Sequence, residues 1–139
     1  MRLLTPLLHV LDASAILALL RKEPGQDVVA DLLADTNNVC LAHAINLCEV
    51  YYDFVRNSDV PTARQVINSL PAQGIVARED MDVAFWQSVG ELKVSPGKIS
   101  LADCCGLALA LRLGAPFVTS DHSEFDPVAA MVHMFPGIW

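Results

Sequence analysis

Residues 7–15 read LLHVLDASA, and this stretch decides the expected fold. Leu7 to Leu11 is a short apolar run of the length of a buried strand. The run ends at Asp12, and the residues from Ser14 to Arg21 follow the pattern of a helix that Pro24-Gly25 ends. A buried strand, an acid at its carboxyl end and a helix directly after it indicate the first unit of an α/β domain.

The same alternation continues along the chain. Further strands are predicted at Val39–Ala42, Ile75–Ala77, Phe117–Thr119 and, as an edge strand, Val132–Phe135. Further helices are predicted at Gln26–Asp35, at Ala44–Arg56, at Thr62–Leu70, from an Asp80 cap to Lys93, and from Leu101, behind a Ser100 cap, to Leu113. Asp126-Pro127 is expected to break the chain after the last helix. Short strands alternating with helices favour an α/β fold with a mainly parallel central sheet.

Composition restricts the class of protein. The chain has 139 residues, 53% of them hydrophobic, so we expect residues 1–139 to form a single domain with a substantial core. The net charge of −7 argues against a DNA-binding module that grips phosphates with basic side chains. It does not exclude an enzyme that meets phosphates through divalent cations, because such a site needs an excess of carboxylates.

Cysteine usage and the N-terminus bear on localisation. The four cysteines form no C-x-x-C pair, so a zinc site is not expected, and they are interpreted as small buried groups in a reducing cytoplasm. Arg2 followed by Leu3 to Leu11 loosely imitates a signal peptide, but Asp12 stands where the cleavage region should be uncharged. No apolar run approaches the roughly 18 residues of a membrane span. We therefore expect a cytoplasmic protein that does not enter a membrane.

Four acids stand at positions where a site can form. Asp12 and Asp121 follow predicted strands, and ligands of parallel sheets bind beyond the carboxyl ends of the strands. Asp103 lies in the first turn of a predicted helix, and Glu49 lies inside a helix that is apolar around it. Four converging carboxylates would repel one another unless a cation compensates. Hard oxygen ligands suit Mg²⁺ or Mn²⁺.

Each acid also has a structural explanation. Asp12 can be a helix cap, Asp103 can complement a helix dipole, and Asp121 can be a turn residue. Glu49 is the hardest to explain in this way, because its neighbours in the helix are apolar. Asp53, one turn further on the same face, is interpreted as a solvated side chain in preference to an additional acid behind the site.

Four motifs in this order resemble those of PIN domains. They are Val10 to Ala15 (VLDASA), Cys48-Glu49-Val50, Leu101-Ala102-Asp103 ahead of an Ala/Leu-rich helix, and Val118 to Asp121 (VTSD) with Phe125 four residues on. Each fragment alone is weak, but their order and spacing agree over nearly the whole chain. The chain is most similar to VapC-like ribonuclease toxins, the toxin half of VapBC-type toxin–antitoxin pairs.

The resemblance implies a PIN-like three-layer α/β/α fold and a metal-dependent endoribonuclease that hydrolyses RNA with a metal-activated water. It implies Mg²⁺ or Mn²⁺ as cofactor, a homodimer, and a small VapB-like antitoxin as partner. It implies that the catalytic, metal-binding residues are Asp12, Glu49, Asp103 and Asp121. Polar positions that help organise the site in relatives match Ser14 and Thr119, with Ser120 a weaker candidate. Tyr51, Tyr52 and Phe54 are candidates for either the core or a dimer interface.

Rival functions fit the residues less well. A haloacid dehalogenase phosphatase needs D-x-D, but Ser14 stands at the third position, and a response-regulator receiver needs a lysine that Thr119 to Asp121 does not offer. Basic residues near the acids are few: Lys98 and Arg112 are the nearest in the sequence, and Arg21 or Lys22 could reach them. The strongest alternative is a non-catalytic PIN-like module that binds RNA or protein.

Overall fold

The computed structural model describes residues 5–95 and 97–121. Within them lies a four-stranded sheet, formed by β1 (Leu7–Leu11), β2 (Asn38–His43), β3 (Ile75–Arg78) and β4 (Phe117–Val118) in the order β3-β2-β1-β4. Every pair of neighbouring strands is parallel. The carboxyl ends of β1 and β4 therefore meet at one edge, which places the residues after them side by side.

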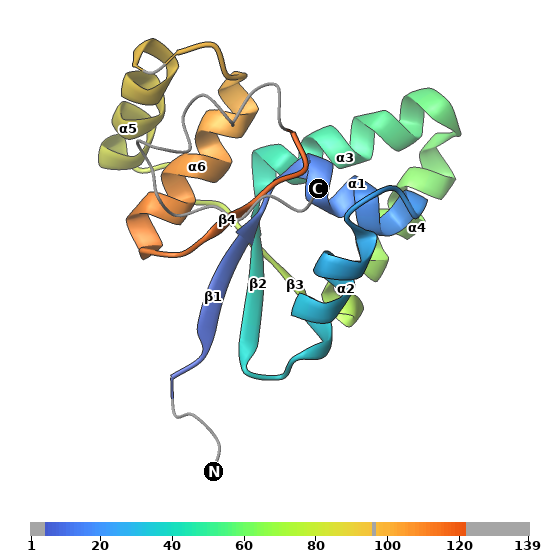
Figure 1. The fold of residues 1–139 in the computed structure, drawn as a ribbon. Coiled ribbons are helices and arrows are strands. Elements are labelled where there is room, and N and C mark those ends of the chain that lie inside the picture. Colours follow the sequence, from blue (N-terminus) through green and yellow to red (C-terminus); the bar gives the residue numbers. More distant parts are fainter. Residues whose placement is uncertain (1–4, 96, 122–139) are drawn as a thin grey trace.

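Helices cover both faces of this sheet (Figure 1). On one face lie α5 (Val83–Val94) and α6 (Leu101–Leu113), and α1 (Ala13–Arg21) and α2 (Gln26–Ala34) lie on the other. The remaining helices are α3 (Ala44–Asn57) and α4 (Val60–Ser69), followed by a short 3₁₀ turn at Pro71–Gln73. The predicted three-layer α/β/α fold with a parallel sheet is confirmed.

Two apolar cores, one on each face, hold the layers together. Val10 and Leu41 point toward α5 and α6, whereas Leu11 and Cys40 point toward α1, α2 and α3. Neighbouring strand residues face opposite sides of a sheet, so both faces of these central strands are buried. This explains why the strands are short, nearly continuous apolar runs rather than alternating ones.

Most predicted elements lie within one or two residues of the observed ones, but the start of α5 differs. Asp82, not the predicted Asp80, caps this helix, and its side chain makes no capping hydrogen bond. The carboxylate of Asp80 is instead held by two arginines, which draws it away from the helix end. The predicted strand Val132–Phe135 and the break at Asp126-Pro127 lie outside the described residues.

The prediction of buried cysteines is correct for three of the four. Cys40, Cys104 and Cys105 are buried, but Cys48 is exposed. Cys48 lies on α3, where its position in the helix turns it toward a surface groove rather than toward the sheet. Among the described helices, none is both long and apolar enough to cross a membrane.

Candidate functional site

Asp12 lies at the junction between β1 and α1, at the carboxyl edge of the sheet. Its side chain is only 1% exposed and caps α1, because Oδ1 accepts a hydrogen bond of 2.9 Å from the backbone N–H of Ala15. The hydroxyl of Ser14 donates to the same oxygen at 2.7 Å. Asp12 is therefore a helix cap, as one interpretation of the sequence proposed. Capping alone, however, does not require such deep burial of a carboxylate.

The segment after β4 completes the surroundings of Asp12. Thr119 is fully buried, and its hydroxyl donates to Oδ2 of Asp12 at 2.6 Å. The same hydroxyl oxygen accepts from the backbone N–H of Asp121 at 3.0 Å, and the Ser14 hydroxyl accepts from the N–H of Ser120 at 3.0 Å. The two strand ends are thus joined by side chains more than 100 residues apart in the sequence. Ser14 and Thr119, the polar residues predicted to help organise the site, lie beside Asp12, and Ser120 contributes its backbone.

Burial makes the ionised form of Asp12 unfavourable. It raises the pKa of this carboxyl from 3.8 to about 6, although the hydrogen bonds from Thr119, Ser14 and Ala15 act in the opposite direction. The nearby charge of Asp121 raises the pKa further. The structure therefore brings Asp12 and Asp121 close enough to repel each other. A cation between or beside them would remove this repulsion and favour ionised Asp12.

Glu49 lies half-buried in a groove between α3, α5 and α6. The groove has a volume of about 490 Å³ and is mostly apolar; its lining includes Tyr52, Trp86, Leu101 and Cys105. Glu49 is near enough to Cys105 to raise the pKa of that thiol, in addition to the larger effect of burial. The prediction that Glu49 has an apolar environment is thus confirmed.

Asp103 lies in the first turn of α6 and is 8% exposed. Its backbone N–H donates to the hydroxyl of Ser100, which caps the helix as predicted. The carbonyl before it, that of Ala102, accepts a hydrogen bond of 3.2 Å from the side chain of Asn46 on α3. An exposed acid would interact with the helix dipole equally well, so the dipole does not explain why Asp103 is buried.

The four predicted acids lie on or directly after elements that border one edge of the sheet: β1, α3, α6 and β4. Among residues 5–95 and 97–121, no three side chains of His, Cys, Asp or Glu are arranged so that they could hold a metal ion. Asp12 and Asp121 lie close enough for the charge of Asp121 to raise the pKa of Asp12. Carboxylate pairs suit Mg²⁺, which keeps several waters and commonly binds through one or two carboxylates plus substrate phosphates. The donor chemistry fits this ion, whereas the four-carboxylate cluster stays a prediction.

A comparison with protein families matches residues 9–130 to the PIN domain. The chain belongs to the PIN-domain family. Proteins of this family are generally nucleases, and those nucleases generally use divalent metals. No curated protein matches the sequence.

Solved structures with the same fold include several toxins. VapBC-1 from nontypeable Haemophilus influenzae superimposes with a TM-score of 0.68 at 18% identity, over 94% of this chain and 96% of that one. VapC20 from Mycobacterium tuberculosis, described as a Sarcin-Ricin loop cleaving toxin, gives 0.68 at 15% identity, over 86% and 94%. DNA-bound VapBC from Salmonella typhimurium gives 0.69 at 15% identity, over 96% and 99%. The resemblance to VapC-like PIN domains is thereby confirmed at the level of the fold.

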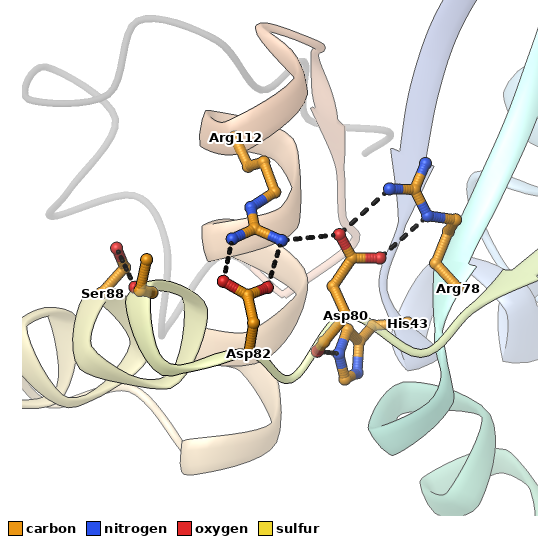
Figure 2. A network of polar contacts seen from close by, with 7 residues as sticks. His43, Arg78, Asp80, Asp82, Ser88 and Arg112 are labelled. Atoms are coloured by element: carbon orange, nitrogen blue, oxygen red, sulfur yellow. Dashed lines mark hydrogen bonds and ion pairs between the residues drawn. The ribbon is translucent and has the colours of Figure 1, made fainter.

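Two of the four basic side chains expected near the acids of this PIN domain, Arg21 and Arg112, are paired with carboxylates. Figure 2 shows Arg112 with both terminal nitrogens on Asp82, at 2.7 and 2.8 Å, and a further bond to Asp80 at 3.0 Å. Arg21 forms an ion pair with Asp53, so the interpretation of Asp53 as solvated is wrong. Arg112 and Arg21 therefore serve to connect helices, while Lys22 and Lys98 are exposed.

Two buried polar residues of this PIN domain, His43 and Asn46, were not predicted from the sequence. His43 caps α3 by accepting from the N–H of Ile45 through Nδ1, so its Nε2 carries the proton and donates to the carbonyl of Asp80 at 2.8 Å (Figure 2). Asn46 is the residue that joins α3 to the first turn of α6. The available signal was their place at the start of an otherwise apolar helix, where a polar side chain needs a partner.

Proposed function

We propose that this PIN domain is a divalent-metal-dependent endoribonuclease and the toxin of a type II toxin–antitoxin system. The observation that carries the proposal is the buried carboxylate of Asp12, fixed by Ser14, Ala15 and Thr119 beside Asp121 at the carboxyl edge of a parallel sheet. Membership of a family of nucleases and the shared fold with VapBC proteins support the same function.

Asp12 and Asp121 are the residues that would bind the ion before substrate is present. We propose that the ion is Mg²⁺ or Mn²⁺. A bound divalent ion supplies a water of lowered pKa and stabilises the charge that develops on the phosphoryl oxygens. Asp12 must be ionised to take part, so it loses its proton as the ion enters. The hydroxyls of Ser14 and Thr119 hold its two oxygens in one orientation. Oδ1 also accepts from the N–H of Ala15, whereas Oδ2 accepts only from Thr119 among the described residues and keeps a lone pair for a ligand.

Glu49 and Asp103 are proposed to complete the site when substrate is present. They lie on α3 and α6, which pack against each other beside the sheet edge. Phosphate oxygens of RNA can occupy ligand positions of a Mg²⁺ ion that the protein leaves open. Ionised Glu49 and Asp103 would then orient the attacking water and balance the charge of the ion.

Recognition of RNA by this chain cannot rest on a broad basic surface. The net charge is −7, and the arginines Arg21, Arg78 and Arg112 are all paired with carboxylates. Non-specific binding through phosphate contacts is therefore weak. We propose that the substrate is one folded RNA, recognised by its shape, and this proposal accords with the Sarcin-Ricin loop activity given for VapC20.

A homodimer and a VapB-like antitoxin are the proposed protein partners, since the structural neighbours are VapBC assemblies. We propose that a second copy contacts the apolar part of the groove between α3, α5 and α6, at Trp86, Tyr52 and Leu101, which expose about half of their surface. Of the three aromatic residues on α3 predicted for core or interface, Tyr52 fits the interface, and Phe54 packs against the core. Substitution of Trp86 by Ser should shift the protein from dimer to monomer in sedimentation.

The test combines metal binding with RNA cleavage. Binding of Mn²⁺ and Mg²⁺ is measured by calorimetry for the wild type and for Asp12→Asn/Asp103→Asn, and cleavage is assayed on the same samples with and without chelator. Asp82→Asn serves as the control, because this carboxylate belongs to the Arg112 pair and should leave cleavage unchanged. Loss of binding and cleavage together in the double variant alone is the expected result. Absence of both in the wild type would refute the proposal and favour a non-catalytic module.

A further inference from the structure

We propose that Asn46 is a positioning residue that sets the direction of Asp103 and the spacing between Asp103 and Glu49. This inference rests on the proposed function, because it concerns two of the acids assigned to that site. Asn46 is fully buried on α3, and its Nδ2 donates to the carbonyl oxygen of Ala102 on α6 at 3.2 Å. Through this bond, Asn46 acts on the backbone that carries Asp103.

The peptide unit between Ala102 and Asp103 is held at both of its polar ends. Its carbonyl oxygen accepts from Asn46, and its N–H donates to the hydroxyl of Ser100 at 3.1 Å. A peptide unit is planar, so fixing its two ends fixes the plane and the bond that leads to the Cα of Asp103. The carboxylate of Asp103 is therefore presented from a backbone with little rotational freedom, even though it lies at a helix start, where ends commonly fray.

On its own helix, Asn46 lies three residues before Glu49, which places the two side chains on neighbouring turns of α3. The hydrogen bond to Ala102 thus joins α3 to α6 within one turn of Glu49 and one residue of Asp103. A change in this contact would move the two acids relative to each other. The distance between Glu49 and Asp103 depends on how α3 packs against α6. The Asn46–Ala102 hydrogen bond fixes this packing near both acids.

Gly106 allows the two helices to approach this closely. A Cβ atom at this position would lie 2.6 Å from Oδ1 of Asn46 and 2.8 Å from the ring of Phe117, both inside contact distance. Gly106 is one turn beyond Ala102 on α6, so it faces the same side chain of α3. Gly106 and the amide of Asn46 therefore pack closely against each other where α3 meets α6.

Stability alone does not explain why a side-chain amide occupies position 46. Its Oδ1 is buried and makes no hydrogen bond with any of the residues that the structure describes. Exchanging Oδ1 with Nδ2 would place an acceptor against the Ala102 carbonyl, so the observed orientation is the favourable one. A buried acceptor without a partner costs stability, and an apolar side chain of similar size would avoid that cost. A role in placing Asp103 accounts for the amide.

Asn38 offers a matched control, because it makes the same kind of bond at the opposite edge of the sheet. Its Nδ2 donates to the carbonyl of Leu32 at 3.1 Å and joins the end of α2 to the start of β2. The experiment compares Asn46→Leu, Asn46→Ala and Asn38→Leu with the wild type. Three quantities are measured: the dissociation constant of Mn²⁺, kcat and KM for RNA cleavage, and hydrogen exchange at the backbone amide of Asp103.

We expect both Asn46 variants to weaken Mn²⁺ binding about tenfold, the size typical when a group behind a metal ligand is removed. They should lower kcat more than they raise KM, and they should speed hydrogen exchange at the Asp103 amide. Asn38→Leu should lower the denaturation midpoint but leave the Mn²⁺ dissociation constant and the exchange at Asp103 unchanged.

Two results would overturn the inference while the proposed function stands. One is a folded Asn46 variant whose Mn²⁺ affinity and kcat stay within about twofold of a wild type that binds and cleaves, which is less than the effect of removing such a group. The other is failure of both Asn46 variants to fold, which would assign Asn46 to the fold itself. If the wild type neither binds Mn²⁺ nor cleaves RNA, the proposed function fails first, and this inference fails with it.

Discussion

Replacing Asp12 by Asn should change the stability of the metal-free protein in a way that depends on pH. Burial raises the pKa of Asp12 to about 6 from 3.8, so the folded state binds this proton more tightly than the unfolded state does. Between these two values, stability falls as pH rises, because the unfolded chain gains its charge more easily. Above pH 6 the folded protein carries the full cost of an ionised, buried carboxylate.

The size of this cost follows from the shift itself. About two pKa units at 1.36 kcal/mol each correspond to about 3 kcal/mol, present at neutral pH, small at about pH 4 and absent at lower pH. Asn is neutral at every pH, and its Oδ1 can still accept from Ser14 and Ala15. Its Nδ2 loses the bond that Thr119 donates, which costs about 1 kcal/mol at all pH values. The variant should therefore be slightly less stable than the wild type in acid and about 2 kcal/mol more stable at neutral pH.

Urea denaturation with chelator present measures this difference from about pH 4 to about pH 7, the window that the two pKa values define. The test is how the difference in unfolding free energy between variant and wild type changes with pH. The lost hydrogen bond shifts this difference equally at every pH, and the other titrating groups are the same in both proteins. A difference that stays constant to within about 0.5 kcal/mol, well below the 3 kcal/mol expected, would refute the assignment of a raised pKa to Asp12. With Mn²⁺ at about 100 times its dissociation constant, the wild type should gain about 2.7 kcal/mol and the variant should gain none.

Three further substitutions test separate parts of the structure. Thr119→Val removes a hydroxyl that stabilises ionised Asp12, so the pH at which cleavage reaches half its maximum should rise by about one unit; an unchanged pH profile would contradict this. Gly106→Ala should lower the free energy of unfolding by about 1–3 kcal/mol through overpacking, whereas Gly90→Ala, with open space around it in α5, should raise it by up to about 1 kcal/mol, both measured in urea. Arg112→Gln should leave KM for RNA unchanged, because this guanidinium is paired with two carboxylates; a clear rise in KM would show that it binds substrate.

Local signals in the sequence were sufficient for most of the fold. The apolar run Leu7–Leu11, the acid after it and the Ser100 and Gly114 boundaries of α6 depend on residues close in the chain, and the structure confirms them. The position of Asp12 beside Asp121 was also predictable, because parallel strands place their carboxyl ends at one edge. These features need no knowledge of side-chain partners.

The predictions that were wrong or missing concern residues whose position depends on a partner far away in the sequence. Asp80 and Asp82 are equally suitable caps in the sequence, and Arg112, about thirty residues away, holds both carboxylates. The exposure of Cys48 depends on how α3 packs against α6. Asn46 carries no local signal of its bond to Ala102, which lies 56 residues further along the chain. Such pairings are set by tertiary packing, which local patterns do not encode.

The buried carboxylate also bears on why the carboxyl edge of the sheet should bind a cation at all. Three hydrogen bonds lower the pKa of Asp12, yet burial outweighs them, so the fold holds at neutral pH a charge that it only partly stabilises. Under the proposed function, a divalent cation would supply the missing compensation and add its binding free energy to folding. Because the chain carries a net charge of −7, the cation is also attracted from a distance. Metal binding at Asp12 should therefore release a proton below about pH 6 and should weaken as the pH falls through that value.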